Sequence, residues 1–230
     1  MLKKIILLAG PTASGKSKLA IGLARKINGE IINADSMQIY KEFSILSSRP
    51  NSKEIKQVQH HLYGIISVIK YFSSGDWLKQ VKKKVNICLK KKKIPIVVGG
   101  TGLYFNTITK GISKIPDIDL KTRNEVRNLY KKLGFKKFYT RLLKLDPKIK
   151  GRILPTDSQR VLRAYEVKLK TKKSLYDWYK NTKSDFLEFE IKKIFIDTPR
   201  EVLLRKISLR TEQMFNKKCI NEVKRFNKLK

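Results

Sequence analysis

The 230-residue sequence has few of the residues that build disulfide frameworks or metal sites. It contains two cysteines, Cys88 and Cys219, without a CxxC spacing, so it supports neither a disulfide framework nor a zinc knuckle. The only two histidines, His60 and His61, are adjacent, and adjacent side chains on a strand point to opposite faces. We therefore expect one buried, hydrogen-bonded histidine and one surface histidine, in preference to a shared metal site.

A long hydrophobic run is also absent. The longest apolar run, Ile5 to Ala9, is far short of the roughly 20 residues that a membrane-spanning helix needs. The first ten residues, MLKKIILLAG, resemble a signal peptide, but their apolar part has about half the usual length and leads directly into a glycine-rich loop. We expect a monomeric cytoplasmic protein without a membrane segment, in which this stretch is a buried strand.

Acidic residues are scarce. The chain has 19 Asp and Glu against 53 Lys and Arg, which gives a formal net charge of +34 and a pI near 10.2. Such a charge attracts polyanions and raises their local concentration. The chain is rich in Lys, Ile and Asn together, a bias that AT-rich coding produces without selection for binding. The charge therefore favours a nucleic acid partner without establishing one.

What the sequence does have is an alternation of apolar and amphipathic stretches. Residues 3–9, 30–35 and 94–100 read as buried strands, and residues 16–27 and 73–93 read as helices with one apolar face. This alternation predicts an α/β fold with a parallel sheet, in which function gathers at the carboxyl ends of the strands. Gly10, Asp35 and Gly99 lie at such ends, so three segments are expected to converge on one edge.

A phosphate-binding loop follows the first predicted strand. The motif G-x-x-x-x-G-K-[ST], between a strand and a helix as its mechanism requires, is matched by Gly10, Pro11, Thr12, Ala13, Ser14, Gly15, Lys16 and Ser17. Its backbone N–H groups and the Lys16 ammonium bind phosphate oxygens, and the Ser17 hydroxyl can ligate Mg²⁺. The motif indicates bound phosphates and leaves open which molecule carries them.

The predicted strand 94–100 lacks the terminal carboxylate with which an ATPase binds its metal ion. It ends in Gly99-Gly100-Thr101-Gly102 instead. The glycines permit close approach of a substrate to the neutral Thr101 hydroxyl; alternatively, the segment is simply a tight turn with a capping Thr101. Asp35 ends the predicted strand 30–35, beside the phosphate loop. From spacing alone it is a helix cap, a Mg²⁺ ligand, or a general base facing a substrate above the phosphates.

The second half of the chain interrupts this pattern. Residues 115–190 carry helical periodicity and no convincing apolar strand. One helical pattern ends before Gly134 and a second runs from Phe138 to Leu145, and a further helix from about Ser158 to Lys170 is capped by Asp157. Residues 191–197 return to a strand pattern, followed by a helix from Pro199 to Met214. We predict a P-loop NTPase-like core, 1–114 and 191–230, with an inserted helical domain over 115–190.

Seven segments, in chain order, resemble those of the tRNA dimethylallyltransferases, also called tRNA isopentenyltransferases: GPTASGKS, INADSMQIY, HHL, FSSGDW, VVGGTGLYF, LDPKIKGRILPTDSQRVLRAYEV and RTEQMF. The resemblance covers about residues 4–223, and GGTGLY and DSMQIY near a P-loop are specific to this family and its adenylate isopentenyltransferase relatives. It implies that the P-loop binds the diphosphate of dimethylallyl diphosphate. It also implies that the acceptor is N6 of the adenine next to the anticodon, position 37, in the tRNA anticodon stem-loop.

The resemblance further implies roles for individual residues. Asp35 is implied as the general base, Thr101 as a hydrogen-bond partner of the bridging oxygen, and Lys16 with Mg²⁺ on Ser17 as stabilisers of the leaving diphosphate. The implied tRNA contacts, in the inserted domain and the core, are Asp35, Ser36, Met37, Gln38, Thr101, Arg123, Gln159, Arg160, Val161, Leu162 and Arg163. Gln159 and Arg163 lie four apart on one helix face, and Arg160 and Arg163 are neighbours by the same rule. The two arginines form either a small basic patch for backbone phosphates or a base edge, or an ordinary solvated surface.

Two departures from the family pattern bear on activity. Leu46-Ser47 stands where family members commonly carry Gly-Thr, and family members continue past the position of Lys230 into a Gly-Tyr-containing segment that contacts tRNA. We therefore expect a truncated or naturally short form. Three alternatives stay open: a P-loop kinase of a nucleoside or small metabolite, an inactive tRNA-binding remnant, and a prenyltransferase acting on a free adenine nucleotide.

Overall fold

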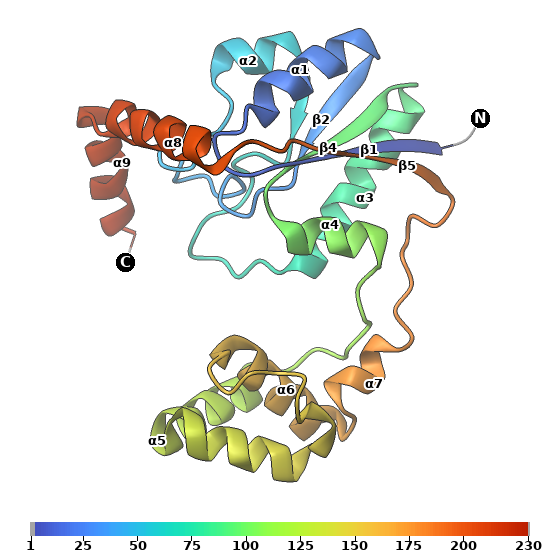
Figure 1. The fold of residues 1–230 in the computed structure, drawn as a ribbon, viewed down its shortest axis with the longest axis vertical. Coiled ribbons are helices and arrows are strands. Elements are labelled where there is room, and N and C mark those ends of the chain that lie inside the picture. Colours follow the sequence, from blue (N-terminus) through green and yellow to red (C-terminus); the bar gives the residue numbers. More distant parts are fainter. Residues whose placement is uncertain (1–2, 230) are drawn as a thin grey trace. The chain divides into compact units, whose positions relative to one another are not determined.

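The computed structural model, which describes residues 3–229, divides the chain into two compact units (Figure 1). Unit 1 consists of Met1–Thr109 and Asp185–Lys230, and unit 2 of Lys110–Ser184. Among residues 3–229, no helix has both the length and the apolar character that crossing a bilayer requires.

Unit 1 is built on a parallel five-stranded sheet with the strand order β3-β2-β4-β1-β5. The strands are β1 (Lys3–Ala9), β2 (Gly29–Asn33), β3 (His60–His61), β4 (Ile94–Gly99) and β5 (Phe189–Phe195). All their carboxyl ends face the same edge, because every pairing is parallel. The α/β fold with a P-loop NTPase-like parallel sheet, expected from the sequence, is confirmed.

Helices cover both faces of this sheet (Figure 1). One face carries α1 (Lys16–Lys26) and α2 (Ser52–Gln57), and the other carries α3 (Ser74–Lys90) and α4 (Gly102–Thr109). Along β1, Ile5 and Leu7 belong to the core on the α3 side, while Ile6 and Leu8 belong to the core on the α1 side. The apolar residues of this strand run without alternation because both of its faces are buried.

Several elements differ from the sequence expectation. The strand expected over 30–35 is β2 and ends at Asn33, so Asp35 lies in the following turn. The helix expected from Pro199 is α8 (Arg200–Met214), and Pro199 is its N-cap and not its first residue. Three further elements, α2, β3 and α9 (Lys217–Asn227), were not predicted, because they are short or strongly polar.

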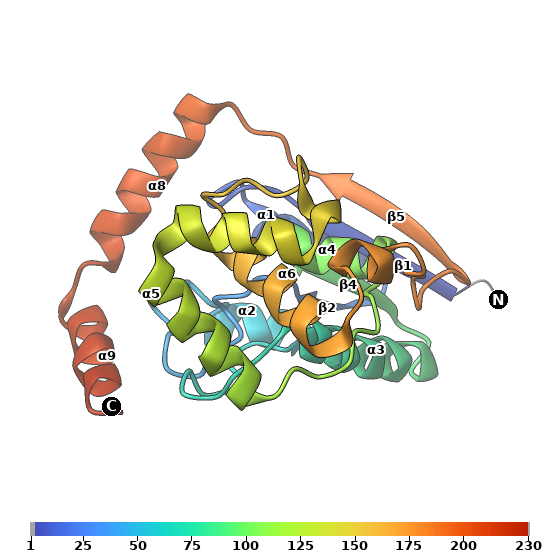
Figure 2. The ribbon, with the colours of Figure 1, turned by 90° about the horizontal axis from the view of Figure 1, so that it is seen from below.

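Unit 2 consists of helices and connecting segments. Its elements are α5 (Leu120–Leu145), the short 3₁₀ helix η1 (Pro147–Ile149), α6 (Ser158–Thr171) and α7 (Leu175–Tyr179). Gly134 has φ 68° and ψ 167°, which bends α5 where the sequence predicted a break between two helical patterns (Figure 2). Asp157 caps α6, as expected, by accepting a hydrogen bond from the Arg160 N–H at 3.1 Å.

Candidate active site at the carboxyl ends of the strands

The loop between β1 and α1 has the form of an anion cradle. Ala13 (φ 63°) and Gly15 (φ 88°) adopt the left-handed conformation, which turns successive backbone N–H groups toward one side. Gly15 is the N-cap of α1, and the first turn of this helix contains no acidic side chain. The positive end of the helix dipole therefore has no acidic partner in its own first turn and can bind an anion.

Two side chains complete the cradle. The Lys16 ammonium donates a hydrogen bond to the carbonyl oxygen of Pro11 at 2.5 Å, so this side chain is folded back over the loop. The Ser14 hydroxyl is buried, and within the described residues it has no hydrogen-bond partner. A buried hydroxyl without a partner is unfavourable, and a phosphate oxygen would satisfy it.

Asp35 lies in a turn that is fixed from both sides. The Asn33 side chain accepts a hydrogen bond from the Asp35 N–H at 2.8 Å and donates hydrogen bonds to the carbonyl oxygens of Asp35 and Leu62. The Asp35 carboxylate in turn accepts a hydrogen bond from the Met37 N–H at 2.9 Å. These bonds hold a half-buried carboxylate at a defined position after β2.

The turn after β4 packs directly on the turn after β2. A Cβ atom on Gly99 would lie 2.1 Å from the carbonyl oxygen of Ala34, so only glycine permits this approach. The Thr101 N–H donates a hydrogen bond to the same carbonyl at 3.2 Å. The Thr101 hydroxyl accepts a hydrogen bond from the Ser36 N–H at 3.0 Å and donates one to the Ser36 hydroxyl at 3.3 Å. Thr101 and the Asp35 turn are therefore one connected structure.

The electrostatics link this structure to the cradle. Burial lowers the pKa of Lys16; the nearby negative charge of Asp35 opposes that effect, and the positive charge of Arg210 adds to it. The net pKa of Lys16 is below that of an ordinary lysine. The charges of Asp35 and Arg210 therefore both act on Lys16, and the segments expected to converge on one edge of the sheet do so.

Arg210 is a cation of this site that the sequence analysis did not single out. It lies on α8, and its Nε donates a hydrogen bond to the Ser48 hydroxyl at 2.8 Å. The signal was available, since Arg210 opens the RTEQMF segment, but a single arginine in so basic a chain is not distinctive by itself.

An aromatic pair supports the Asp35 turn from within the core. The rings of Trp77 and Tyr104 are stacked, with centroids 4.1 Å apart and an interplanar angle of 8°. The Trp77 indole donates a hydrogen bond to the carbonyl oxygen of Asn33 at 2.9 Å. Burial, with smaller effects from Tyr40 and Asp35, raises the pKa of Tyr104 to about 12, so its hydroxyl stays neutral.

The tRNA contacts expected in unit 1 differ in their accessibility. Met37 is 56% exposed. The Gln38 side chain is half-buried, and its amide donates hydrogen bonds to the carbonyl oxygens of Ser47 and Ser48 at 2.9 and 3.0 Å. Gln38 is therefore held by the segment that also carries the partner of Arg210.

The contacts expected in unit 2 lie mainly in the first two turns of α6. Gln159 and Arg160 are exposed, and Arg160 forms an ion pair with Asp157 at 3.4 Å. Arg163 is half-buried and forms an ion pair with Glu166 at 3.6 Å. Arg123 on α5 is half-buried. Two neighbouring residues of α6 face inward: Val161 is fully buried in the core of unit 2, and Leu162 packs against that core. The Val161 side chain is therefore unavailable to RNA, so a contact there must use its backbone.

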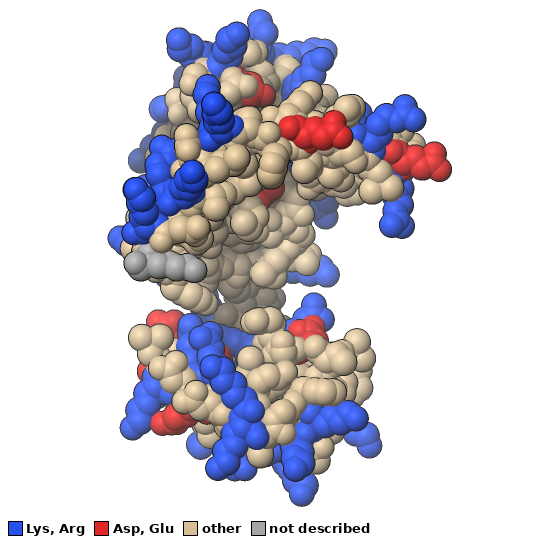
Figure 3. Space-filling model, turned by 90° about the vertical axis from the view of Figure 1, so that its left-hand side faces the viewer, with Lys and Arg blue, Asp and Glu red and all other residues tan. Residues whose placement is uncertain are grey.

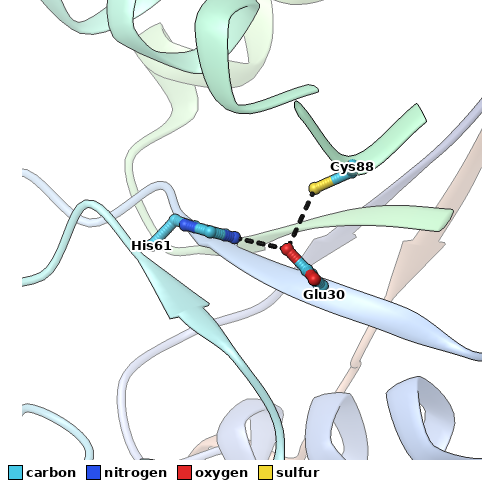
Figure 4. Close-up of side chains that lie close together, drawn as sticks. All are labelled: Glu30, His61 and Cys88. Atoms are coloured by element: carbon cyan, nitrogen blue, oxygen red, sulfur yellow. Dashed lines mark hydrogen bonds and ion pairs between the residues drawn. The ribbon is translucent and has the colours of Figure 1, made fainter. Parts of the chain in front are cut away.

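A second polar cluster joins β2, β3 and α3 (Figure 4). Glu30 on β2 accepts hydrogen bonds from His61 at 2.6 Å and from the Cys88 thiol at 3.6 Å. The ligand atoms of these three residues lie within 4.8 Å of one another, as a metal site requires. However, the ammonium groups of Lys91 and Lys93 lie 3.8 Å from the other Glu30 oxygen and compete with a metal ion for this carboxylate. We interpret the cluster as structural.

The sequence predicted one buried, hydrogen-bonded histidine and one surface histidine, and only the first part of this prediction is right. His61 is the buried, hydrogen-bonded histidine, with a side chain 9% exposed. His60 is half-buried and not a surface residue, because its Nδ1 lies 2.7 Å from the carbonyl oxygen of Val58 and its ring contacts Tyr63 edge-on.

Comparison with known proteins identifies the family. The model of the IPP transferase family matches residues 38–230. The chain is similar to the tRNA dimethylallyltransferase of Pelagibacter ubique, with 57% identity over 227 residues, covering 99% of this chain and 72% of that protein.

Two solved structures are similar over almost the whole chain. A eukaryotic dimethylallyltransferase acting on tRNA has a TM-score of 0.84 and 29% identity, covering 99% of this chain and 56% of that one. The tRNA isopentenylpyrophosphate transferase of Bacillus halodurans has a TM-score of 0.63 and 30% identity, covering 98% of this chain and 70% of that one. The present chain thus spans slightly more than half of the eukaryotic enzyme. On sequence and structure together, the chain belongs to the IPP transferase family.

Proposed function

We propose that this chain transfers the dimethylallyl group of dimethylallyl diphosphate to N6 of the adenine at position 37, next to the anticodon of tRNA, as a cytoplasmic monomer. Family membership supports this activity. The observation that carries the proposal is the junction of three segments: the anion cradle 10–17, the Asp35 turn, and a β4 end whose residues 99–102 contain no carboxylate. A cradle beside a base and a hydroxyl suits a departing diphosphate better than ATP hydrolysis.

In this proposal the cradle binds the leaving group. The backbone N–H groups of the loop, the Lys16 ammonium and the Ser14 hydroxyl would bind the diphosphate oxygens. Arg210 adds a second positive charge close to Lys16. Because these groups are already in place before reaction, they stabilise the charge that develops as diphosphate departs.

A divalent cation fits the first turn of α1. The Ser17 hydroxyl is exposed there, and oxygen ligands are those that Mg²⁺ prefers. Mg²⁺ bound to Ser17 and the diphosphate would neutralise part of the leaving group's charge.

The transfer itself requires a base. The N6 lone pair is delocalised into the adenine ring, so the free amine is a weak nucleophile. As N6 attacks the allylic C1, the C1–N6 bond forms, the C1–O bond breaks, and its electron pair leaves with diphosphate. The Asp35 carboxylate accepts the N6 proton, a role consistent with its fixed position beside the cradle. The Thr101 hydroxyl is the proposed hydrogen-bond donor to the bridging oxygen.

The tRNA must deliver its base out of the stack, at a cost of a few kcal/mol that a single-stranded loop keeps low. Lys and Arg side chains are spread over the face shown in Figure 3, on both units, and this charge favours binding of the tRNA backbone. We propose that Ser36 to Gln38 contact the target region, and that the exposed Gln159 and Arg160, with the half-buried Arg123 and Arg163, contact tRNA through unit 2.

The test is direct. Purified protein is incubated with dimethylallyl diphosphate, Mg²⁺ and unmodified tRNA, and the tRNA is digested and analysed by mass spectrometry. We expect one added five-carbon unit on adenine 37. Parallel reactions with AMP as acceptor, and with ATP and nucleosides, are expected to give neither a prenylated nucleotide nor ATP turnover. Salt-sensitive tRNA binding without any product would instead indicate an inactive binding protein, and ATP turnover a kinase.

A further inference from the structure

The side chain of Glu222 on α9 is buried, and four hydrogen-bond donors from one distant loop surround it. The residue is 3% exposed. It accepts hydrogen bonds from the backbone N–H groups of Ser44, Ile45 and Leu46 at 2.9 to 3.1 Å, and from the Ser44 hydroxyl at 2.8 Å. Three successive N–H groups directed at one carboxylate form a specific anion-binding arrangement, which a chance surface contact does not produce.

A second contact fixes the same helix to the same loop. The rings of Phe43 and Phe226 are 5.0 Å apart, one turn of α9 beyond Glu222. Burial alone would raise the pKa of Glu222, but the hydrogen bonds from the loop outweigh this and lower it, so the carboxylate is charged at neutral pH. The loop of residues 43–48, here called the 43–48 loop, is therefore attached to α9 by both a charge and an aromatic pair.

The end of the 43–48 loop reaches the candidate active site. The Ser48 hydroxyl accepts the hydrogen bond of Arg210, and the carbonyl oxygens of Ser47 and Ser48 accept those of the Gln38 amide. One loop thus connects Glu222 with an arginine beside Lys16 and with a glutamine of the DSMQ segment. Within residues 3–229, the Glu222 carboxylate forms no hydrogen bond with Arg210 or with Gln38.

We propose that Glu222 is a positioning residue for the transfer reaction, an inference that depends on the proposed function. By anchoring the 43–48 loop, it holds Gln38 in the orientation that receives the tRNA. Loss of the anchor leaves the cradle and Asp35 intact, since these are fixed by β1, β2 and β4. The expected effect therefore falls on the binding of tRNA, with much less effect on the chemical step.

The test uses matched variants of the full chain. In Glu222→Gln, the amide places an N–H₂ group where the loop presents donors, whereas Glu222→Asp keeps the charge on a shorter side chain. Glu212→Gln, on exposed α8, removes the same charge and serves as the control. We expect Glu222→Gln to raise KM for tRNA by about tenfold or more with kcat within about threefold, Glu222→Asp to recover most of the loss, and Glu212→Gln to match wild type.

Two further measurements separate positioning from general destabilisation. If Glu222 acts through Gln38, the effects of Glu222→Gln and Gln38→Ala on KM for tRNA are less than additive. Hydrogen exchange at the amides of residues 44–46 should accelerate in Glu222→Gln, a readout that does not depend on catalysis. Should Glu222→Gln not fold, Ser44→Ala removes one donor and is expected to raise KM by a smaller factor.

An unchanged KM for tRNA in a folded Glu222→Gln, strictly additive effects with Gln38→Ala, or unchanged amide exchange would overturn the proposal. Absence of product from the wild-type protein would instead reject the proposed function, while the exchange result would still report on the anchor.

Discussion

The hydroxyl of Thr101 joins the turn after β4 to the turn after β2, because it accepts the hydrogen bond of the Ser36 N–H at 3.0 Å. Its own hydrogen is directed at the Ser36 hydroxyl at 3.3 Å, a long and weak bond for two hydroxyls. This proton is therefore easily redirected to a stronger acceptor. An oxygen carrying the developing charge of a departing diphosphate is such an acceptor.

The first prediction concerns this hydroxyl. Thr101→Ala removes the donor and is expected to lower kcat by about 10²-fold, the usual cost of removing one such donor. Thr101→Ser retains the hydroxyl and should stay within about tenfold of wild type. Thr109→Ala, which removes a hydroxyl bonded to the Phe105 carbonyl within α4, is the control. Equal activity of Thr101→Ala and wild type would remove Thr101 from the mechanism.

Asp35→Asn tests the base. The amide can still accept the hydrogen bond of the Met37 N–H, so the turn should keep its shape while the proton acceptor is lost. We expect kcat to fall by about 10²- to 10⁴-fold, with the dissociation constant for dimethylallyl diphosphate changed by less than about threefold. Single-turnover kinetics and calorimetric binding measure the two quantities separately. A variant that keeps a tenth or more of wild-type kcat would contradict the assignment.

The pH dependence of diphosphate binding tests the pair Lys16 and Arg210. The pKa of Lys16 is lowered by burial and by Arg210, against the opposing effect of Asp35. Lys16 therefore loses its charge at a lower pH than an exposed lysine, and kcat/KM for dimethylallyl diphosphate should fall on the alkaline side below the ordinary value of 10.5. In Arg210→Gln the repulsion is gone, so this alkaline limb should move to higher pH even though overall affinity falls. An alkaline limb that stays in place or moves to lower pH would show that the two charges do not interact.

Stability at low pH should depend on Glu30. Burial raises its pKa, but the hydrogen bond and charge of His61, the charge of Lys91 and the Cys88 thiol outweigh burial, so the folded-state pKa is below the ordinary 4.5. A depressed carboxylate pKa contributes stability that is present above pH 4.5 and is lost as the pH falls through the folded-state value. Glu30→Gln should therefore flatten the acid limb of the unfolding free energy. It should also cost about 1 to 3 kcal/mol at neutral pH, since the buried His61 and Cys88 side chains lose their charged hydrogen-bond acceptor.

Urea unfolding of wild type and Glu30→Gln at a series of pH values measures both effects. Glu188→Gln, at an exposed ion pair with Lys3, is the control and should change little. Parallel acid limbs for Glu30→Gln and wild type would contradict the account of this cluster.

The pattern of apolar residues within a segment was sufficient to predict those helices and strands whose buried faces show directly in that pattern. Continuous apolar runs predicted β1 and β4, one-sided periodicity predicted α3, and the Gly134 break predicted the bend in α5. The phosphate loop was equally evident, because its function requires a fixed spacing of glycines and a lysine between a strand and a helix.

The residues that the sequence did not predict as part of the site depend on contacts between segments far apart in the sequence. Glu222 interacts with a loop 176 to 178 residues earlier, and Arg210 with Ser48, 162 residues earlier. No periodicity encodes such pairs. Val161 is different, because the helical spacing that places Gln159 and Arg163 on one face already turns Val161 toward the opposite, buried face.

The most direct test of the account is a crystal structure of the chain with an unreactive thio analogue of dimethylallyl diphosphate and an anticodon stem-loop carrying unmodified adenine 37. The account predicts the diphosphate within the 10–17 loop, in contact with Lys16 and the Ser14 hydroxyl, and the Asp35 carboxylate within hydrogen-bonding distance of N6. A diphosphate bound elsewhere, or an Asp35 side chain directed away from the adenine, would contradict it.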